Sequence, residues 1–288
     1  MKKKIVAAVA ACAALALSAC LLAGCSSSSS SASASASASA SASGSASAAA
    51  TKFVVGFDAE YPPYGFMGDD GKPAGFDLDL ATEVAKRNNW TIELQAIDWD
   101  AKDALVDSGA ITCIWNGFTM EGREDSYAFS KPYMNNSQVI MVKKGSPIKT
   151  EADLAGKTVL TQTGSAAEEL LNDAEEGLAD LMATFAGGKV NTIADYTNAV
   201  MQLESGAVDA LACDSSIADY FMAQKADAYE IAIVLSPEHY AVGFKKDNQA
   251  MADTVTATLQ AMVKDGTVAK IIDKWASEGI NKDAWCLE

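Results

Sequence analysis

Asp214 and the residues around it could hold a charged ligand. The apolar segment 207–213 leads into Asp214, and Ser215 and Ser216 follow directly. A carboxylate in this position can bind a cation or cap the helix that follows, and the two roles compete for the same oxygens. If Asp214 binds a ligand, one of the two serines caps the helix instead. A second apolar segment, 111–114, leads into the polar group Asn116, Gly117 and Thr119.

Arg123 is the residue best suited to hold a carboxylate. Its planar guanidinium offers two parallel, charge-assisted hydrogen bonds to one carboxylate group. The alternative is a surface ion pair with Glu121, Glu124 or Asp125, its close neighbours in the chain. Residue type and spacing leave both interpretations open.

A third polar group, Gly164-Ser165-Ala166, stands between a predicted strand over 158–161 and a predicted helix. Backbone N–H groups at the start of a helix bind anions. The N–H of Ala166, with Ser165 beside it, could therefore share a carboxylate with Arg123. The alternative is a simple turn in which Ser165 caps the helix.

The residues that catalysis needs are sparse. His239 is the only histidine, and no cysteine or aspartate constellation surrounds it in the sequence. Asp58 and Glu60 could in principle act as a general acid pair. No metal-ligand spacing, Gly-rich phosphate loop or nucleophile elbow occurs. We therefore expect no cofactor and no metal, and a binding protein in preference to an enzyme.

Apolar strands alternate with amphipathic helices along the chain. The segment 53–57 predicts a buried strand, and 91–96 alternates as a second strand. Between them, 78–88 predicts a helix with Asp77 at its N-cap. A short helix over 103–108 follows. This alternation predicts an α/β fold with a largely parallel sheet.

Two parts of the chain repeat one pattern. Ser108-Gly109-Ala110 and Ser205-Gly206-Ala207 each end a predicted helix, and a strand begins immediately afterwards. Glycine takes the left-handed position after a helix without steric cost. Ligands of open α/β sheets bind at the carboxyl ends of the strands. We therefore expect the two polar strand ends to face each other across a cleft.

Five motifs together resemble family 3 solute-binding proteins, the amino-acid receptors of ABC importers. In chain order they are Asp58-Ala59-Glu60-Tyr61-Pro62-Pro63-Tyr64, Gly75-Phe76-Asp77-Leu78-Asp79-Leu80 with Val84 and Ala85 after it, Trp115-Asn116-Gly117-Phe118-Thr119-Met120, Phe129-Ser130-Lys131-Pro132-Tyr133, and Asp265-Gly266-Thr267. The resemblance covers about residues 52 to 279. It implies a two-lobed periplasmic-binding-protein-like fold (type II) with the ligand cleft between the lobes.

The resemblance also implies the domain boundaries. The first lobe takes residues 52–133 and returns over 239–288, and the second lobe takes 137–234. Two crossings near 134–136 and 235–238 join them. Two connections permit closure of the lobes around a ligand.

By the same resemblance, Arg123 binds the α-carboxylate of an amino acid and Asp214 binds its ammonium. This chain is one residue shorter than the family's common spacing just before Arg123. Thr119 and Ser165 assist at the carboxylate with the N–H of Ala166, and the Gly117 carbonyl assists at the ammonium. The remaining predicted site residues are Asp58, Tyr61 and Trp99, which line the side-chain pocket, and Asn116 and Gly164.

These residues suit a polar side chain, and glutamine, cystine, histidine and arginine all remain open. Some relatives of this fold are enzymes, so an arogenate or cyclohexadienyl dehydratase is the alternative to a receptor. The expected partners are a free amino acid and an ABC permease, and the chain is expected to be a monomer.

The N-terminal residues predict export. Lys2 to Lys4 precede an apolar run over 5–23, which is typical of a signal peptide, although a transmembrane anchor is the alternative. Leu22-Ala23-Gly24-Cys25 resembles the lipobox of bacterial lipoproteins more closely than the segment ending at Cys20 does. We expect a signal peptide over 1–24, and over 25–51 a lipidated Cys25 with a Ser/Ala-rich tether. The protein would then be extracytoplasmic and anchored to the membrane.

The charge of the chain excludes one class of partner. It carries 38 acidic and 22 basic side chains, a net charge of −16. Nucleic acid should repel such a chain. The cysteines after the tether, Cys113, Cys213 and Cys286, are odd in number and irregular in spacing. They favour free thiols over a disulfide framework or a metal site.

Overall fold

The computed structural model describes residues 51–175 and 178–288. The expected signal peptide, the lipidation site Cys25 and the tether up to residue 50 lie outside the described residues. No helix in the described part of the chain is long and apolar enough to cross a membrane. Cys113, Cys213 and Cys286 are free thiols, and the first two are buried.

The first lobe is built on a five-stranded sheet. Its strands, in spatial order, are β5 (Thr91–Ile97), β1 (Lys52–Asp58), β6 (Cys113–Ile114), β13 (Gly243–Lys245) and β7 (Tyr127–Phe129). β1 pairs in parallel with β5 and β6, and β13 runs antiparallel to β6 and β7. A small three-stranded sheet follows β1 in the chain and consists of β2 (Glu60–Tyr61), β3 (Gly65–Met67) and β4 (Pro73–Ala74).

Both faces of the first sheet are buried, because the side chains of β1 alternate between two cores. Phe53, Val55 and Phe57 pack into one core, and Val54 packs into the other with Val106. Four helices contribute to these cores: α1 (Phe76–Arg87), α7 (Gln249–Lys264) and α8 (Thr267–Trp275) to the first, and α2 (Lys102–Ser108) to the second.

The second lobe has a five-stranded sheet of its own. The order is β10 (Asn191–Ile193), β9 (Val159–Gln162), β11 (Ala210–Asp214), β8 (Met134–Lys143) and β12 (Tyr229–Tyr240). β9 pairs in parallel with β10 and β11, whereas β8 is antiparallel to β11 and β12.

The side chains of β8 also alternate between two cores. Val139 and Met141 join the core of α5 (Tyr196–Ser205) and α6 (Ser215–Gln224). Ile140 and Val142 join the core beside α3 (Ala166–Asn172) and α4 (Leu178–Met182). A strand buried on both faces reads as a continuous apolar run, as residues 139–142 of β8 do.

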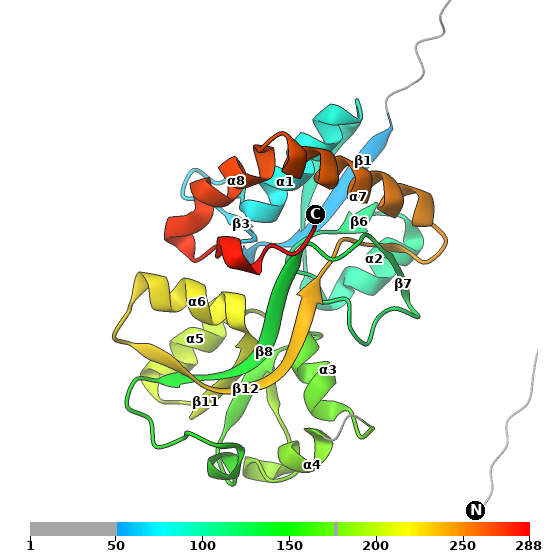
Figure 1. The fold of residues 1–288 in the computed structure, drawn as a ribbon. Coiled ribbons are helices and arrows are strands. Elements are labelled where there is room, and N and C mark those ends of the chain that lie inside the picture. The colour runs from blue at the N-terminus through cyan, green and yellow to red at the C-terminus, as the bar shows by residue number, and fades with distance from the viewer. Residues whose placement is uncertain (1–50, 176–177) are drawn as a thin grey trace, which may run out of the picture. The chain divides into compact units, whose positions relative to one another are not determined.

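The two lobes are connected by β8 and β12, which run side by side between them (Figure 1). The two strands pair in antiparallel register from Met134 with Tyr240 to Lys143 with Tyr229. The N–H of Tyr133, just before β8, donates to the Tyr240 carbonyl at the first lobe. The crossings near 134–136 and 235–238 therefore form one hydrogen-bonded ribbon and not two separate linkers.

The predicted α/β class is confirmed, but the prediction of a largely parallel sheet is wrong, because half of the strand pairings in each five-stranded sheet are antiparallel. The local predictions hold to within a few residues in most places. The strands at 53–57 and 91–96 are β1 and β5, and the helix at 103–108 is α2. The two predicted helix ends are also found, since Gly109 and Gly206 have φ angles of 75° and 76°.

The predicted start of α1 is wrong. The helix begins at Phe76, and Asp77 lies in its first turn without capping it. The N-cap position belongs to Gly75, with a φ of 147°. A Cβ there would stand 2.1 Å from the Tyr64 carbonyl oxygen, so the position requires glycine. The Asp77 carboxylate instead accepts hydrogen bonds from the Gly117 N–H and the Tyr133 hydroxyl, at 2.7 Å each.

Candidate ligand-binding site

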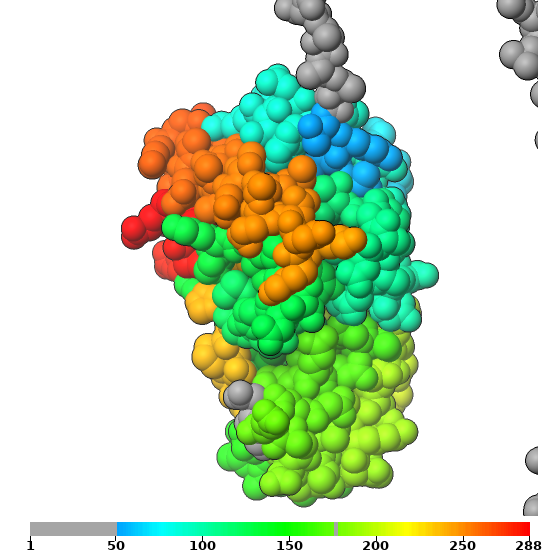
Figure 2. All heavy atoms as spheres, turned by 90° about the vertical axis from the view of Figure 1, so that its right-hand side faces the viewer, coloured from blue at the N-terminus to red at the C-terminus, as the bar shows by residue number. Residues whose placement is uncertain are grey.

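The polar ends of strands from both sheets meet at one small cavity. Its volume is about 10 Å³, roughly the space that one water molecule needs. In Figure 2 the atoms of the first lobe (blue to teal, and orange) and of the second lobe (yellow-green) meet on the visible face without a wide opening. The residues that line the cavity are Tyr61, Trp99, Gly117, Thr119, Arg123, Gln162, Ser165, Ala166, Tyr196 and Asp214.

Most of the predicted site residues lie at this cavity. Those that line it are Tyr61, Trp99, Gly117, Thr119, Arg123, Ser165, Ala166 and Asp214. Three predicted residues do not line the cavity but form hydrogen bonds next to it: Asp58, Asn116 and Gly164. Gln162 and Tyr196 line it and were not predicted.

Asn116 and Asp58 join the ends of β6 and β1. The Asn116 side-chain oxygen accepts a 2.5 Å hydrogen bond from the Asp58 N–H. The Asp58 carboxylate crosses to the second lobe, where it accepts a 2.5 Å hydrogen bond from Gln162 Nε2. Burial raises the pKa of Asp58 to about 6, although the bonds from the Glu60 N–H and Gln162 oppose this rise. The carboxyl therefore lies between the lobes with a charge that is costly to keep unpaired.

Asp58 also lines a second, larger cavity beside the first, with a volume of about 540 Å³. Trp99 lines both cavities and stands between them. The larger cavity is strongly acidic, with carboxylates from Asp58, Glu60, Asp98, Asp100 and Asp195. A cationic or amide-bearing group is the chemistry that such a wall favours.

Gly164 contributes its carbonyl to a contact between the lobes. The oxygen accepts hydrogen bonds from Trp99 Nε1 at 3.2 Å and from Lys102 Nζ at 3.0 Å. The Lys102 side chain is buried, and this burial, together with the charge of Arg123, lowers its pKa. Gly164 therefore holds the two lobes together from behind the cavity.

Arg123 is buried, with 6% of its surface exposed. The surface pairing with Glu121, Glu124 or Asp125 that its position in the sequence allowed is therefore wrong. Nη1 donates to the Thr119 carbonyl at 3.2 Å, and the guanidinium lies over the Phe118 ring, 4.8 Å from its centroid.

The carboxylate that meets Arg123 comes from the other lobe. Glu169 of α3 places Oε1 2.9 Å from Arg123 Nη2. Nη2 forms no hydrogen bond to any described residue, so its contact with Glu169 is an ion pair without a hydrogen bond. The Glu169 side chain is 49% exposed, so water screens the attraction. Arg123 is thus held by a partner that a ligand carboxylate can replace.

Asp214 does not cap α6. Its Oδ1 accepts three hydrogen bonds, from Asn136 Nδ2 at 3.0 Å, Gln138 Nε2 at 2.9 Å and the Tyr240 hydroxyl at 2.9 Å. Its Oδ2 has no hydrogen-bond donor among the described residues. One Asp214 oxygen is thus held in place while the other stays available to a ligand.

The expectation that a serine caps α6 is also wrong. Asn136 of β8 performs this role, because its Oδ1 accepts from the Ser216 N–H at 3.2 Å and from the Ser215 hydroxyl at 2.8 Å. The side-chain nitrogen of the same Asn136 donates to Asp214. The start of α6 and the Asp214 carboxylate are therefore positioned by one residue.

Glu238 of β12 is a second buried carboxyl beside Asp214. Its Oε1 accepts from Asn136 Nδ2 at 2.6 Å, Gln138 Nε2 at 2.9 Å and the Thr119 hydroxyl at 3.0 Å. Burial, and next the charge of Asp214, raise the pKa of Glu238 far above its ordinary value. We call Asp214 and Glu238 the carboxyl pair.

A group of tyrosines forms the wall next to the carboxyl pair. The Tyr61 hydroxyl lies 3.1 Å from that of Tyr240, which in turn lies 2.7 Å from the Ser216 hydroxyl. The rings of Tyr61 and Tyr196 have centroids 6.0 Å apart. Tyr196 is fully buried, and its hydroxyl has no hydrogen-bond partner among the described residues. Gly117 is required here, since a Cβ with its φ of 57° would approach Tyr61 to 2.9 Å.

Ser165 caps α3, so its expected role as an N-cap is found together with its place at the cavity. Its hydroxyl accepts from the Glu168 N–H at 3.1 Å and lies 3.1 Å from the Thr161 hydroxyl. Ala166 is the first residue of that helix.

Sequence reasoning missed five residues of this site: Gln162, Tyr196, Asn136, Gln138 and Glu238. Gln162 ends β9, so the rule that ligands bind at strand ends could have identified it. The last three lie on β8 and β12, which were treated only as crossings. Their role depends on strand register, which pairs Asn136 with Glu238, and no local sequence signal reports it.

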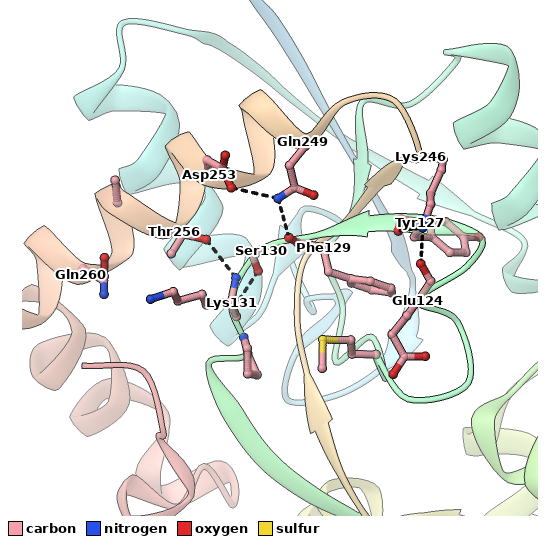
Figure 3. Close-up of a pocket in the computed structure, with 13 residues that line it drawn as sticks. Glu124, Tyr127, Phe129, Ser130, Lys131, Lys246, Gln249, Asp253, Thr256 and Gln260 are labelled. Atoms are coloured by element: carbon pink, nitrogen blue, oxygen red, sulfur yellow. Dashed lines mark hydrogen bonds between the residues drawn. The ribbon is translucent and has the colours of Figure 1, made fainter.

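A further pocket, of about 520 Å³, lies on the first lobe between β7 and α7 (Figure 3). Its polar groups bond mainly to one another. Gln249 Nε2 donates to Asp253 at 2.9 Å and to the Phe129 carbonyl at 3.3 Å. The Lys131 N–H donates to the Thr256 hydroxyl at 2.9 Å. These bonds join the helix to the edge of the sheet, and we assign no ligand to this pocket.

Residues 53–278 match the family model of the bacterial extracellular solute-binding proteins, family 3. The match covers most of the chain, and this protein therefore belongs to that family. The expected two-lobed, periplasmic-binding-protein-like fold of type II is confirmed with it.

Two relatives bind the same amino acid by name. The L-cystine-binding protein TcyJ of Escherichia coli (strain K12) is 30% identical over 233 residues, which are 80% of this chain and 84% of TcyJ. The L-cystine-binding protein TcyA of Bacillus subtilis (strain 168) is 30% identical over 232 residues, which are 79% of this chain and 82% of TcyA.

Solved structures agree with this assignment. The crystal structure of an ABC uptake transporter substrate binding protein from Streptococcus pneumoniae with bound histidine superposes with a TM-score of 0.74 at 33% identity. The match covers 80% of this chain and 94% of that protein. These relatives are binding proteins, in agreement with the expectation of a receptor in place of an enzyme.

Proposed function

We propose that this chain is the extracytoplasmic substrate-binding protein of an ABC importer and that it captures a polar amino acid. One observation carries this proposal: Arg123 from the first lobe and Asp214 from the second line the same small cavity. A free amino acid has a carboxylate and an ammonium on one carbon, and these two side chains match them in charge. Relatives named as cystine-, histidine- and arginine-binding proteins support this choice.

The carboxylate of the ligand replaces Glu169 at Arg123, with Thr119, Ser165 and Ala166 around it. The ammonium meets the Asp214 oxygen that has no protein donor. We assign the Gly117 carbonyl to the ammonium as well. Each charged group of the ligand then finds a partner that offsets its loss of water.

The ligand side chain points toward Asp58 and Gln162, with the rings of Tyr61 and Trp99 on either side. Burial and the nearby charges of Asp195 and Glu60 raise the pKa of Asp58, so a further hydrogen-bond donor would stabilise its carboxylate. A guanidinium, imidazole, amide or second ammonium would supply one. Arginine, histidine, glutamine and cystine are therefore the ligands that we propose.

Ligand entry requires the lobes to separate, because the cavity of about 10 Å³ is too small for an amino acid. We propose that residues 52–133 and 239–288 move against residues 137–234 about the ribbon of β8 and β12. The contacts that separate are those between lobes: Asp58 with Gln162, Arg123 with Glu169, and Gly164 with Trp99 and Lys102. Closure on a ligand then presents one defined surface to the permease.

We further propose that residues 1–24 are a lipoprotein signal peptide and that Cys25 carries the lipid. Residues 25–51 would tether a monomeric receptor to the membrane next to the permease. Replacement of Cys25 by serine should release the protein from the membrane fraction, and unchanged membrane association would contradict the anchor.

Thermal unfolding of the full chain in the presence of each of the twenty amino acids and cystine tests the ligand class. A ligand present at 100 times its dissociation constant should add about 2.7 kcal/mol to the free energy of unfolding. We expect stabilisation by at least one of arginine, histidine, glutamine and cystine. No shift with any amino acid would overturn the proposed function.

Arg123→Ala should abolish this stabilisation and should leave the far-ultraviolet circular dichroism spectrum unchanged. Arg87→Ala is the matched control. Arg87 also forms ion pairs, with Glu83 and Asp265, but it lies on α1 outside the cavity, so this variant should bind normally. Wild-type affinity in Arg123→Ala would rule out the carboxylate assignment.

A further inference from the structure

The carboxyl pair, Asp214 and Glu238, is joined by two amide groups. Each of the side-chain nitrogens of Asn136 and Gln138 donates to both carboxyls, at distances of 2.6 to 3.0 Å. Two carboxyl oxygens that share the same two donors must lie close together. Glu238 is 5% exposed and Asp214 is 4% exposed. Two negative charges so close and so well buried repel each other strongly, so ionisation of Glu238 is costly unless a cation is present.

One buried acceptor beside the pair has no hydrogen-bond donor. Gln138 is 1% exposed, and its side-chain oxygen has no hydrogen-bond partner among the described residues. A buried acceptor without a donor is costly. An ammonium brings three N–H donors and no acceptor, so it is the group that best completes this arrangement. Gln138 thus provides an observation independent of the two carboxyls.

We infer that Asp214 and Glu238 hold one proton between them in the unliganded protein and that the ligand ammonium takes its place. This inference rests on the proposed function, since it concerns how an amino acid binds. When the ammonium arrives, the Glu238 O–H bond breaks, the electron pair stays on the carboxylate and the proton leaves to solvent. The pair then carries two negative charges against one positive charge from the ligand, and the amide donors remain in place.

Other ionisable groups approach Glu238 from several elements. The Tyr240 hydroxyl, from the end of β12, bonds to the partner Asp214. Arg123 donates to the carbonyl of Thr119, whose hydroxyl contacts Glu238. On the other side of Glu238 is a groove of about 790 Å³ whose acidic residues are Glu121, Glu124, Glu169 and Asp173. His239, next in the chain, pairs with Glu121.

The charges in this set oppose ionisation of Glu238 more than they favour it, since Arg123, the buried cation among them, is already paired with Glu169. Burial and the nearby Asp214 are the main reasons why the pKa of Glu238 is raised. Below this raised pKa the unliganded protein keeps the proton, and binding releases it, so affinity rises as pH rises.

Titration calorimetry of the full chain tests the inference. L-Arginine, L-glutamine, L-histidine and L-cystine are titrated at pH 7.0 in two buffers that differ in their enthalpy of ionisation, and the difference between the buffers gives the number of protons released. We expect about one proton per bound ligand, and a dissociation constant that falls by up to about tenfold per pH unit between pH 7 and 8.

Glu238→Gln keeps the size and removes the exchangeable proton. This variant should release no proton and should show no dependence of affinity on pH over that range. Glu124→Gln is the matched control, because Glu124 lines the same groove but does not contact the carboxyl pair. The control should keep both the proton release and the pH dependence.

The outcomes separate the two proposals. If none of the four amino acids binds the wild-type chain, the proposed function fails, and this inference with it. If one binds without proton release, or if Glu238→Gln releases as many protons as the wild type, the role of Glu238 is overturned while the receptor function stands. If Glu238→Gln does not fold, Gln138→Leu is the second variant. It removes one shared donor and should change the number of protons released.

Discussion

The two ends of the candidate site are built in different ways. Arg123 belongs to the first lobe, and its carboxylate partner Glu169 comes from the second lobe and is half exposed. Asp214 is buried, and the amides that hold it, Asn136 and Gln138, lie on the strand that connects the lobes. The positive end is thus formed only when the lobes are together, whereas the negative end is assembled on the hinge.

This difference indicates the order in which a ligand meets the site. In the opening that we propose, the contact of Arg123 with Glu169 is lost, while the bonds within β8, β11 and β12 remain. A preassembled carboxylate site in the second lobe can bind an ammonium first. Closure then brings Arg123 to the carboxylate and completes the cavity.

Of the three predictions below, the largest change in free energy is expected at Asp214, in the preassembled end of the site. Asp214→Asn removes the charge that faces the ammonium, and we expect binding to weaken by roughly 2–5 kcal/mol. Titration calorimetry with the ligand identified by thermal unfolding measures this loss. Asp209→Asn is the control, since Asp209 precedes the same strand and accepts only the Thr158 N–H. Wild-type affinity in Asp214→Asn would show that the ammonium is held elsewhere.

An intermediate effect is expected where the lobes meet at Asp58. Because burial raises the pKa of Asp58 to about 6, the folded chain binds a proton there more tightly than the unfolded chain does. The associated stability is fully present below the unfolded pKa of about 4 and is lost as the pH rises through about 6. The free energy of unfolding should therefore fall by up to about 3 kcal/mol from this group.

Urea denaturation between pH 4 and pH 7 measures this slope, and Asp58→Asn should flatten it relative to the wild type. Asp265→Asn is the control, because the Asp265 pKa is lowered to about 2, mainly by the hydrogen bond from Arg87. The contribution of Asp265 is present above the unfolded pKa and is lost as the pH falls toward 2, outside the tested range. Equal slopes in the wild type and Asp58→Asn would contradict the buried position of Asp58 in solution.

The smallest effect is expected at the end that forms on closure. Glu169→Gln removes the carboxylate that the ligand must displace from Arg123. Because Glu169 is half exposed, we expect affinity to increase by no more than about 1 kcal/mol. Calorimetry at low salt, where the ion pair is strongest, is the most sensitive measurement. A loss of affinity would indicate that Glu169 helps closure more than it competes with the ligand.

Much of the fold could be predicted from the sequence. The strands β1 and β5 follow from apolar runs and alternation, and the ends of α2 and α5 follow from Gly109 and Gly206. The start of α1 was mispredicted because an aspartate near a helix start is usually its cap. Here the Asp77 side chain instead bonds to the N–H of Gly117, 40 residues further along the chain.

The site could be predicted in part. Arg123 and Asp214 could be proposed because their residue types and neighbours suit a charged ligand. Glu238 could not be proposed, because an acidic residue on a connecting strand usually faces solvent. Its burial depends on the pairing of β12 with β8, which places it opposite Asn136.

The sequence by itself determined the α/β class, the family motifs and the supply of a guanidinium and several carboxyls. Only the tertiary structure decided which of these groups meet. Asn136 and Glu238 are 102 residues apart in the chain, and Asp58 and Gln162 are 104 apart. Local spacing reports the geometry within one turn or one strand, whereas such contacts are formed by strand register and the packing of one lobe on the other.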